Sequence, residues 1–249
     1  MRPGLAAAAA AAYLGALLWV DRGVGYPTQL GLGVLTWLVL LAALVRLPAA
    51  RRAQTLGVVV FATAGEVTGS LIWGVYSYRL HNLPLFIPPA HGLVYLAGLS
   101  LSMTPLARRH ARALVVLAGT SATLWCLLGL TVLPRRDVAG AFGVPLLLAF
   151  LWLSRNRATY AGVFLVVGAL ELYGTAIGTW RWAAELPGTG IPDGNPPSGV
   201  ASGYVWFDVM AMLCAPLLVR AGTTVAGFAS RRDAGTQVPA PAPAREPTS

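Results

Sequence analysis

The chain has 249 residues, of which 56% are hydrophobic and only 11% are charged, a composition that excludes an ordinary soluble domain. The net charge of +9 comes from arginine alone, since the sequence contains no lysine. Because these arginines lie between apolar runs, they match the flanks of membrane helices and not a nucleic-acid surface, and no nucleic-acid partner is expected.

Eight apolar segments follow one another along the chain, and each is long enough to form a membrane-crossing helix. The first lacks a polar cleavage region behind it, so we interpret it as a retained helix and not as a signal peptide. The segments span residues 4–20, 28–47, 55–78, 89–106, 113–133, 138–154, 158–181 and 199–219. From residue 221 the chain turns polar and then rich in proline and alanine, which predicts a disordered cytoplasmic tail over 221–249.

The arginines also predict an orientation. An even number of spans places both termini on the same side of the membrane. If the N-terminus is cytoplasmic, 13 arginines lie inside and 5 lie outside, as the positive-inside rule requires. We therefore expect a multi-pass protein of the cell membrane with both termini in the cytoplasm and with its proline-rich connections on the outer face.

The second half of the chain repeats a pattern of the first half. In each copy Arg-Ala, a glycine and a glutamate precede a second glycine, an aromatic pair and Pro-Pro, and the glutamates stand 105 residues apart. The matched residues are Arg52, Ala53, Gly57, Glu66 and Gly69 in the first copy and Arg157, Ala158, Gly162, Glu171 and Gly174 in the second. The sequence thus predicts an all-α polytopic membrane helix bundle of about eight transmembrane helices, built as two parallel four-helix repeats over residues 1–106 and 107–220.

Three acidic residues, Glu66, Glu171 and Asp208, interrupt apolar segments and are the candidate catalytic residues. A charge near the middle of a bilayer is costly, so such residues are functional candidates by default. Counted along regular helices, each lies roughly 15 Å below the outer boundary, so we expect the three to share one layer. Because buried carboxylates repel one another, at least one is expected to hold a proton at neutral pH and to serve as a general acid.

Aromatic and polar residues near these acids are the candidates for binding a substrate. Aromatic faces can stabilise a developing cation, although residues at segment ends also form an interfacial belt. Arg79 and Arg181 either grip an anionic headgroup or only extend toward water. The candidate substrate-binding residues are Trp73, Tyr76, Tyr78, Arg79, His91, Trp180, Arg181, Trp182, Asn195 and Tyr204.

Known cofactor patterns are missing from the sequence. Its three histidines, His81, His91 and His110, have no paired spacing, so no metal site is predicted, although a Glu/His/Asp site near His91 stays open. No phosphate loop, serine-hydrolase motif, zinc-protease motif or Cys-x-x-Cys occurs. We expect no cofactor, and the expected partner is a membrane lipid or a lipid-soluble substrate.

The pattern Glu66-x-x-Gly69 followed by Gly74-x-Tyr76-x-Tyr78 resembles the membrane family of carotenoid-biosynthesis proteins that includes the bacterial and archaeal carotenoid hydratases. Those polytopic proteins add water across a terminal double bond of an isoprenoid chain. In that family a histidine often lies one helical turn before the glutamate, where this chain has Ala62. The resemblance covers the third and fourth segments, with a fainter copy from Glu171 to Trp182. It implies acid-assisted hydration of an isoprenoid.

Three functions stay open at this point. The first is a lipid-phase lyase (hydratase) or isomerase in which Glu66 and Glu171 are the proton donor and its partner and Asp208 is a third acid. The second is a proton-coupled transporter of a small molecule or lipid, because repeats and midplane acids also characterise carriers. The third is a non-catalytic membrane subunit. An enzyme predicts a lipid-accessible cavity at the acids, a carrier predicts an aqueous path, and a subunit predicts fully bonded acids without a cavity.

Overall fold

The computed structural model describes residues 2–235, with side chains through Arg220. Within that part of the chain, six helical stretches are long and apolar enough to cross a membrane, which indicates a membrane protein. They are α1 (Pro3–Asp21), α2 (Tyr26–Val45), α3 (Ala49–Glu66) with its π-helical continuation η1 (Val67–Trp73), α6 (Ala111–Thr131), α9 (Arg157–Ala176) and the Val200–Arg220 part of α10 (Val200–Gly235).

The remaining helices are shorter. They are α4 (Ile87–Ser102), α5 (Pro105–Arg109), α7 (Val138–Ala141) and α8 (Val144–Leu153). Each of the eight predicted segments contains a helix. However, α4 has 16 residues and α8 has 10, against the 20 or so that cross a bilayer core. Six of the eight predicted spans therefore reach the length of a membrane helix.

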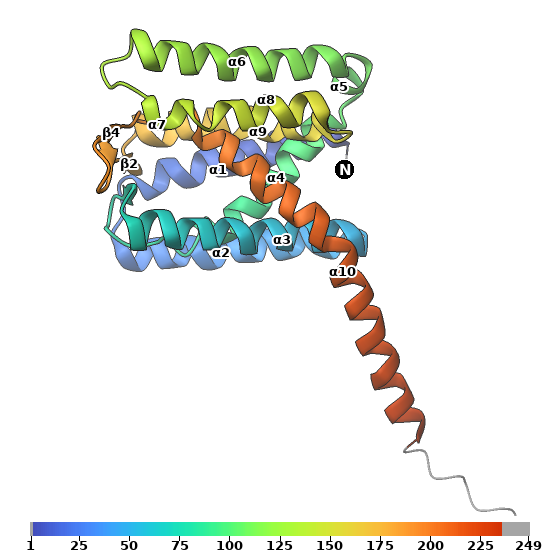
Figure 1. Cartoon of the computed structure of the whole chain (residues 1–249). Helices are drawn as coiled ribbons and strands as arrows, with labels where there is room; N and C mark the ends of the chain where they lie inside the picture. Colours follow the sequence, from blue (N-terminus) through green and yellow to red (C-terminus); the bar gives the residue numbers. More distant parts are fainter. Residues whose placement is uncertain (1, 236–249) are drawn as a thin grey trace, which may run out of the picture.

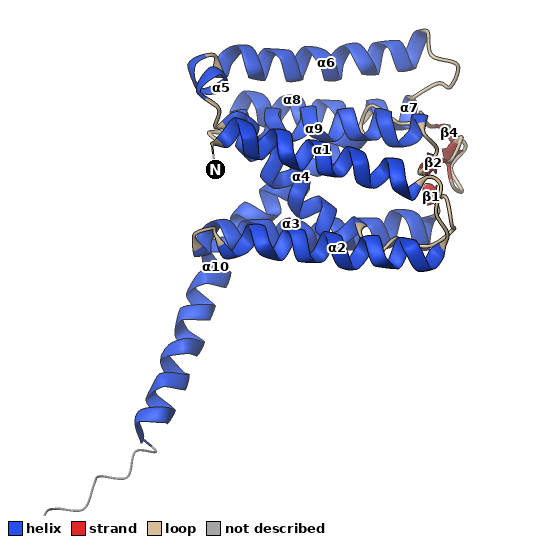
Figure 2. Cartoon of the chain, turned by 180° about the vertical axis from the view of Figure 1, so that it is seen from behind, coloured by secondary structure: helices blue, strands red, loops and turns tan. Residues whose placement is uncertain are grey.

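The long helices run back and forth between two ends of the bundle (Figure 1). We call one the sheet end, because four short strands lie there: β1 (Tyr76–Tyr78), β2 (Trp180–Trp182), β3 (Glu185–Leu186) and β4 (Ile191–Pro192). Strand β1 pairs with β2, and β3 pairs with β4, both antiparallel. The N-terminus lies at the opposite end (Figures 1 and 2).

The predicted helices over 55–78 and 158–181 are too long at their ends, because the aromatic pairs form strands. Helix η1 stops at Trp73 and α9 stops at Ala176. Soon after each stop a glycine has a positive φ, 77° at Gly74 and 79° at Gly178. Glycine adopts this left-handed conformation without a steric penalty and therefore ends helices well. The chain reverses there and enters β1 or β2.

The centre of the bundle is built from two close helix pairs. Helix α3 packs along α10, and α4 packs along α9. A Cβ placed on Gly57 would lie 3.0 Å from the Cβ of Ala211. A Cβ placed on Gly162 would collide with the backbone carbonyl of Gly98. Small residues at both crossings let the helices approach closely, as in other membrane bundles.

Candidate functional site

A cavity of about 280 Å³ lies inside the bundle, and both Glu66 and Glu171 line it. That volume is near the lower bound for pockets that hold small molecules. Most of its wall is apolar. Among the lining residues are Leu14, Leu18, Ile87, Val94, Leu170 and Phe207. The polar part of the wall comes from the two glutamates, His91, Tyr204 and the aromatic side chains of β1 and β2.

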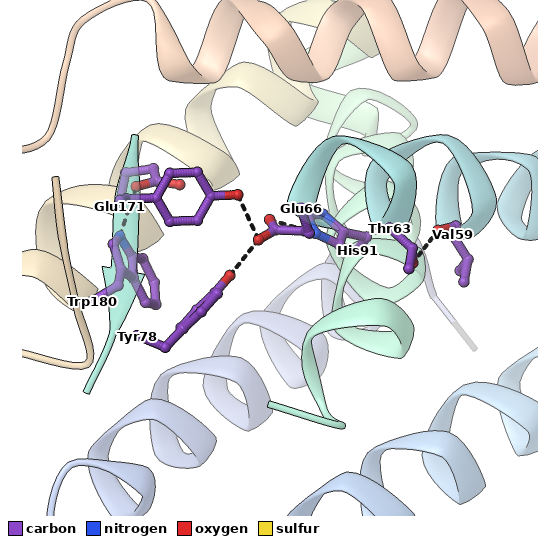
Figure 3. A network of polar contacts seen from close by, with 8 residues as sticks. Val59, Thr63, Glu66, Tyr78, His91, Glu171 and Trp180 are labelled. Carbon is purple, nitrogen blue, oxygen red and sulfur yellow. Dashed lines mark hydrogen bonds and ion pairs between the residues drawn. The ribbon is translucent and has the colours of Figure 1, made fainter. Parts of the chain in front are cut away.

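Glu66, the last residue of α3, is held by three side chains. The hydroxyls of Tyr76 and Tyr78 each donate a hydrogen bond of 2.6 Å to its Oε2. The Nε2 of His91, on α4, lies 3.1 Å from its Oε1 (Figure 3). Both oxygens of this buried carboxyl group therefore have partners, from β1 and from α4.

The chain reversal after η1 brings the two tyrosines to Glu66. Tyr76 falls within the segment 55–78 that is predicted to be helical, but it is a strand residue that points back toward the acid. Alternate residues of a strand face the same side, so Tyr78 points the same way. A Cβ on Gly69 would lie 3.0 Å from the Tyr76 ring, so this glycine leaves room for the returning tyrosine.

Glu171, in α9, has a different environment. The indole N–H of Trp180, on β2, donates a hydrogen bond of 2.9 Å to its Oε2 (Figure 3). A Cβ on Gly174 would collide with the Trp180 ring, so Gly174 makes room for an aromatic residue as Gly69 does. In both copies of Glu-x-x-Gly the glycine therefore makes room for an aromatic ring beside the glutamate. Glu171 accepts one hydrogen bond of normal geometry, from Trp180, whereas Glu66 has three side-chain partners.

The acids lie closer to the sheet end than the sequence predicted. The expected depth of roughly 15 Å assumed regular helices up to the aromatic pairs. Glu66 stands only seven residues before the end of η1, and Glu171 only five before the end of α9. At about 1.5 Å per residue these distances are at most about 11 and 8 Å.

Asp208 does not join the two glutamates. It is 1% exposed, and its Oδ2 has no hydrogen-bond partner in the described part of the chain. It is not among the residues that line the cavity. Its neighbour Tyr204, one turn earlier on α10, does line the cavity and packs against the His91 ring with centroids 5.2 Å apart.

Two nitrogens beside the cavity are buried without a hydrogen-bond partner among the residues described. They are Nδ1 of His91 and Nε1 of Trp182, and both residues belong to the cavity wall. Buried polar atoms usually have a partner, so unpaired ones at a cavity mark a place where a bound molecule can supply the missing bond.

Three candidate binding residues form hydrogen bonds with backbone groups and do not line the cavity. Trp73 is 47% exposed and donates to the carbonyl of Pro187 at 3.2 Å. The guanidinium of Arg79 donates to the carbonyls of Asp21 and Val24 at the end of α1. The side chain of Asn195 accepts a bond of 3.0 Å from the backbone N–H of Trp182. These hydrogen bonds fix the loops and strands of the sheet end relative to one another.

Arg135 and Asp137 position the loop that follows β2, and neither is among the site residues predicted from the sequence. Asp137 is buried and accepts hydrogen bonds from the backbone N–H groups of Gly140, Gly194 and Ser198 at 3.1, 3.2 and 2.7 Å. This fixes the loop that leads to Gly199 in the cavity wall. The stretch Pro134-Arg-Arg-Asp137 lies between two apolar segments, as the flank of a membrane helix does, and no local signal distinguishes a flanking acid from a loop anchor.

Asp193 belongs to the same anchor. It is 1% exposed, and burial followed by the nearby charge of Asp137 raises its pKa to about 6. Ionisation of Asp193 near neutral pH therefore lowers the free energy of unfolding.

No group of three or more His, Cys, Asp or Glu side chains that could hold a metal ion occurs among the described residues.

No protein-family model matches the chain, and no curated protein or solved structure is significantly similar to it. The resemblance to the carotenoid-biosynthesis family therefore rests on the residues from Glu66 to Tyr78 and their fainter copy.

Proposed function

We propose that this protein is a multi-pass enzyme of the cell membrane that binds an isoprenoid-like lipid in its cavity and acts on it by proton transfer. The observation that carries the proposal is the placement of two buried carboxyl groups, Glu66 and Glu171, on one apolar and aromatic cavity inside a bundle of membrane helices. Such a wall suits an alkene chain, and a carboxylic acid is the proton source that addition to an alkene needs.

The two acids have different roles in this proposal. Hydrogen bonds donated to a carboxylate favour its ionised form, and Glu66 has two tyrosine hydroxyls and His91 around it. Glu171 accepts one hydrogen bond of normal geometry, from Trp180, with the Trp182 indole as a further neighbour, and it shares the cavity with a second acid that has more hydrogen-bond donors around it. Glu171 is therefore the proton donor, and Glu66 is its ionised partner.

The proton balance closes on these two groups, with one water molecule as a further reactant in the hydration branch. Protonation of a substrate C=C bond by Glu171 leaves a carbocation on the chain and a carboxylate on Glu171. The faces of Tyr76 and Trp182, together with ionised Glu66, stabilise that cation. Addition of water with loss of its proton to a carboxylate gives an alcohol, which is hydration. Loss of a proton from a neighbouring carbon gives a shifted double bond, which is isomerisation.

The resemblance to the carotenoid hydratases supports the same chemistry. The histidine that those proteins often carry one turn before the glutamate is Ala62 here. In this chain His91 of α4 brings an imidazole to the glutamate instead, 3.1 Å from Oε1. From the resemblance we infer the substrate class, an isoprenoid chain with a double bond.

A duplication is part of the proposal. The close contact of Gly57 with Ala211 between α3 and α10 has a counterpart between α9 and α4, where Gly162 meets Gly98. The matching strands β1 and β2 pair antiparallel, as equivalent segments do across a two-fold axis. We therefore place two four-helix repeats over 1–106 and 107–220, with α4 and the α7–α8 pair as their short spans.

We also propose the orientation of the bundle. The sheet end faces outward and both termini face the cytoplasm. The positive-inside rule supports this, because most arginines between the segments belong to the opposite end. The predicted disordered tail covers 221–249. Residues 221–235 instead continue helix α10 as far as Gly235, and residues 236–249 lie outside the described residues.

A proton-coupled transporter is the second candidate, since paired acids on a cavity between related halves also suit a carrier. A purely structural subunit is less well supported, because it needs neither the cavity nor the unpaired nitrogens of His91 and Trp182.

Lipid composition tests the proposal directly. Extracts from the wild type, a deletion strain and the deletion complemented with wild type, Glu66→Gln or Glu171→Gln are compared by untargeted mass spectrometry. We expect one lipid to accumulate on deletion while a second lipid disappears, with neither Gln variant restoring it. A mass difference of one water identifies hydration, and equal masses with different retention identify isomerisation.

Glu185→Gln is the matched control, because Glu185 is an exposed glutamate at the sheet end that does not line the cavity. It should restore the lipid profile fully. Identical profiles in all strains, with the protein present in the membrane, would overturn the enzymatic proposal. Proton-coupled uptake would then be measured in vesicles.

A further inference from the structure

The β1–β2 ribbon has two chemically different faces. Tyr76, Tyr78, Trp180 and Trp182 line the cavity. Ser77 and Arg181 stand directly opposite each other in the register and belong to the other face, because alternate strand residues point to opposite sides. The ribbon therefore separates the apolar cavity from a polar surface at the sheet end.

A second pocket, of about 350 Å³, lies on that polar face. Two guanidinium groups and two hydroxyl groups line it, from Arg135, Arg181, Ser70 and Ser77, and no acidic side chain does. Guanidinium groups bind phosphate oxygens through charge-assisted hydrogen bonds, and serine hydroxyls add neutral donors. The composition of this pocket therefore fits a phosphate.

The two arginines of the pocket differ in their freedom. The guanidinium of Arg135 donates to the carbonyls of Trp182, Ala183 and Asp193 and is held in place. Arg181 is exposed, and its guanidinium makes no hydrogen bond or ion pair with any described residue, whereas its backbone pairs with Ser77. Burial lowers the pKa of Arg135, the charge of Asp193 raises it, and the like charge of Arg181 lowers it, so the two guanidinium groups lie close enough to repel each other. An anion between them relieves this repulsion.

The pocket and the cavity share a wall. Tyr76 and Trp182 line both spaces, and their rings pack against each other with centroids 4.5 Å apart. A molecule whose head lies against Arg181 has its chain at these two rings, directly beside the cavity that holds the glutamates. The indole Nε1 of Trp182 makes no hydrogen bond of normal geometry within the described chain and lies near the Glu171 carboxyl group, so this wall connects the pocket to the acids.

We propose that the second pocket is the headgroup site of the substrate and that the substrate is an isoprenoid lipid bearing a phosphate. Arg181 and Ser77 bind the phosphate oxygens, Arg135 adds a fixed positive charge, and the chain passes Tyr76 and Trp182 into the cavity. The placement of the chain rests on the function proposed above. The phosphate site itself does not.

The full-length protein in nanodiscs of neutral phosphatidylcholine provides the test. Farnesyl phosphate and farnesol are titrated separately while tryptophan fluorescence is recorded, because Trp180 and Trp182 line the wall. We expect farnesyl phosphate to bind about tenfold more tightly than farnesol, the difference that one charge-assisted contact gives. Arg181→Gln should remove that difference and leave farnesol binding unchanged, and Arg181→Lys should keep part of it.

Arg136→Gln is the control. Arg136 directly follows Arg135 in the chain, is exposed, and lines neither the pocket nor the cavity. It should leave both affinities unchanged. Equal affinities for the two ligands, unaffected by Arg181→Gln, would overturn the headgroup site and leave the cavity proposal standing. Absence of binding by either ligand would contradict both, and the lipid profiles of the glutamate variants then decide the cavity separately.

Competition distinguishes other sources of phosphate. If inorganic phosphate binds at Arg181 as tightly as farnesyl phosphate, the site takes the free ion and the amphiphile proposal is wrong. If anionic phosphatidylglycerol nanodiscs abolish the advantage of farnesyl phosphate, the occupant is a bulk phospholipid headgroup, and the proposal is again wrong. Persistence of the advantage in both experiments supports a phosphorylated isoprenoid.

Discussion

Glu66 and Glu171 stand in matching stretches of the chain, yet their surroundings differ. Each glutamate precedes a glycine by three residues, and each glycine makes room for an aromatic side chain that returns from a strand. Around Glu66 the returning side chains are two tyrosines, and His91 completes the set. Around Glu171 it is the indole of Trp180. The comparison shows that one local motif gives two glutamates different sets of hydrogen-bond donors, and the proposed roles of anion and proton donor rest on that difference.

The largest expected effect separates the two acids by activity. Glu171→Gln should lower conversion of the lipid about 100-fold or more, because it removes the general acid. The protein should remain folded, since glutamine still accepts the Trp180 bond. Conversion and the unfolding temperature are measured on the same preparations. Normal conversion by Glu171→Gln together with loss of conversion by Glu66→Gln would reverse the two assigned roles.

The next effect concerns the tyrosines. Replacing both Tyr76 and Tyr78 by Phe should destabilise the protein by about 3 kcal/mol, because a buried carboxylate loses two charge-assisted hydrogen bonds. In a Glu66→Gln background the same double change should cost clearly less, which a double-mutant cycle measures from unfolding in detergent. Equal costs in both backgrounds would show that the tyrosines stabilise the fold by packing and not through Glu66.

A smaller effect tests the two glycines. Gly174→Ala should cost about 1–3 kcal/mol, because the new Cβ collides with the Trp180 ring. Gly69→Ala should cost less, since its Cβ would lie 3.0 Å from the Tyr76 ring, which can move slightly. Gly15→Ala, with nothing within 4 Å, is the matched control and should be neutral or mildly stabilising. The order of the three unfolding temperatures is the measurement.

The smallest effect concerns the loops that follow β1 and β2. The first is tied by Arg79 to α1, and the second is anchored by Asp137 beside Asp193. The folded-state pKa of Asp193, about 6, lies above its ordinary value of 3.8, so folding favours the protonated form. The cost of ionisation is absent below 3.8, grows as the pH rises, and is complete above about 6.

Asp193→Asn should therefore raise the unfolding temperature by a few degrees at pH 7.5, where the wild-type carboxyl group is ionised. The gain should shrink as the pH falls through 6 and vanish below 3.8. A gain that is the same at every pH would show that the substitution acts through something other than the charge.

Part of the site could be read from the pattern of residues. The apolar segments, the two glutamates and the aromatic pairs are local features, and a helix appears in each predicted segment. The strands could not be read in this way. Three-residue aromatic stretches carry no periodic signal, and they become strands because Gly74 and Gly178 reverse the chain after η1 and α9 and the two returning segments meet.

By itself the sequence determined a membrane protein of apolar helices with Glu66, Glu171 and Asp208 inside them, because hydrophobicity and an interrupting acid are properties of a segment. Only the tertiary structure decided which acids meet. It brings Glu66 and Glu171 to one cavity and leaves Asp208 outside its wall. It also decides that Tyr76 and Tyr78 bind Glu66 and that Arg181 faces away from the cavity. Pairing of β1 with β2 joins residues more than 100 positions apart, and such contacts depend on how helices pack, which no single segment encodes.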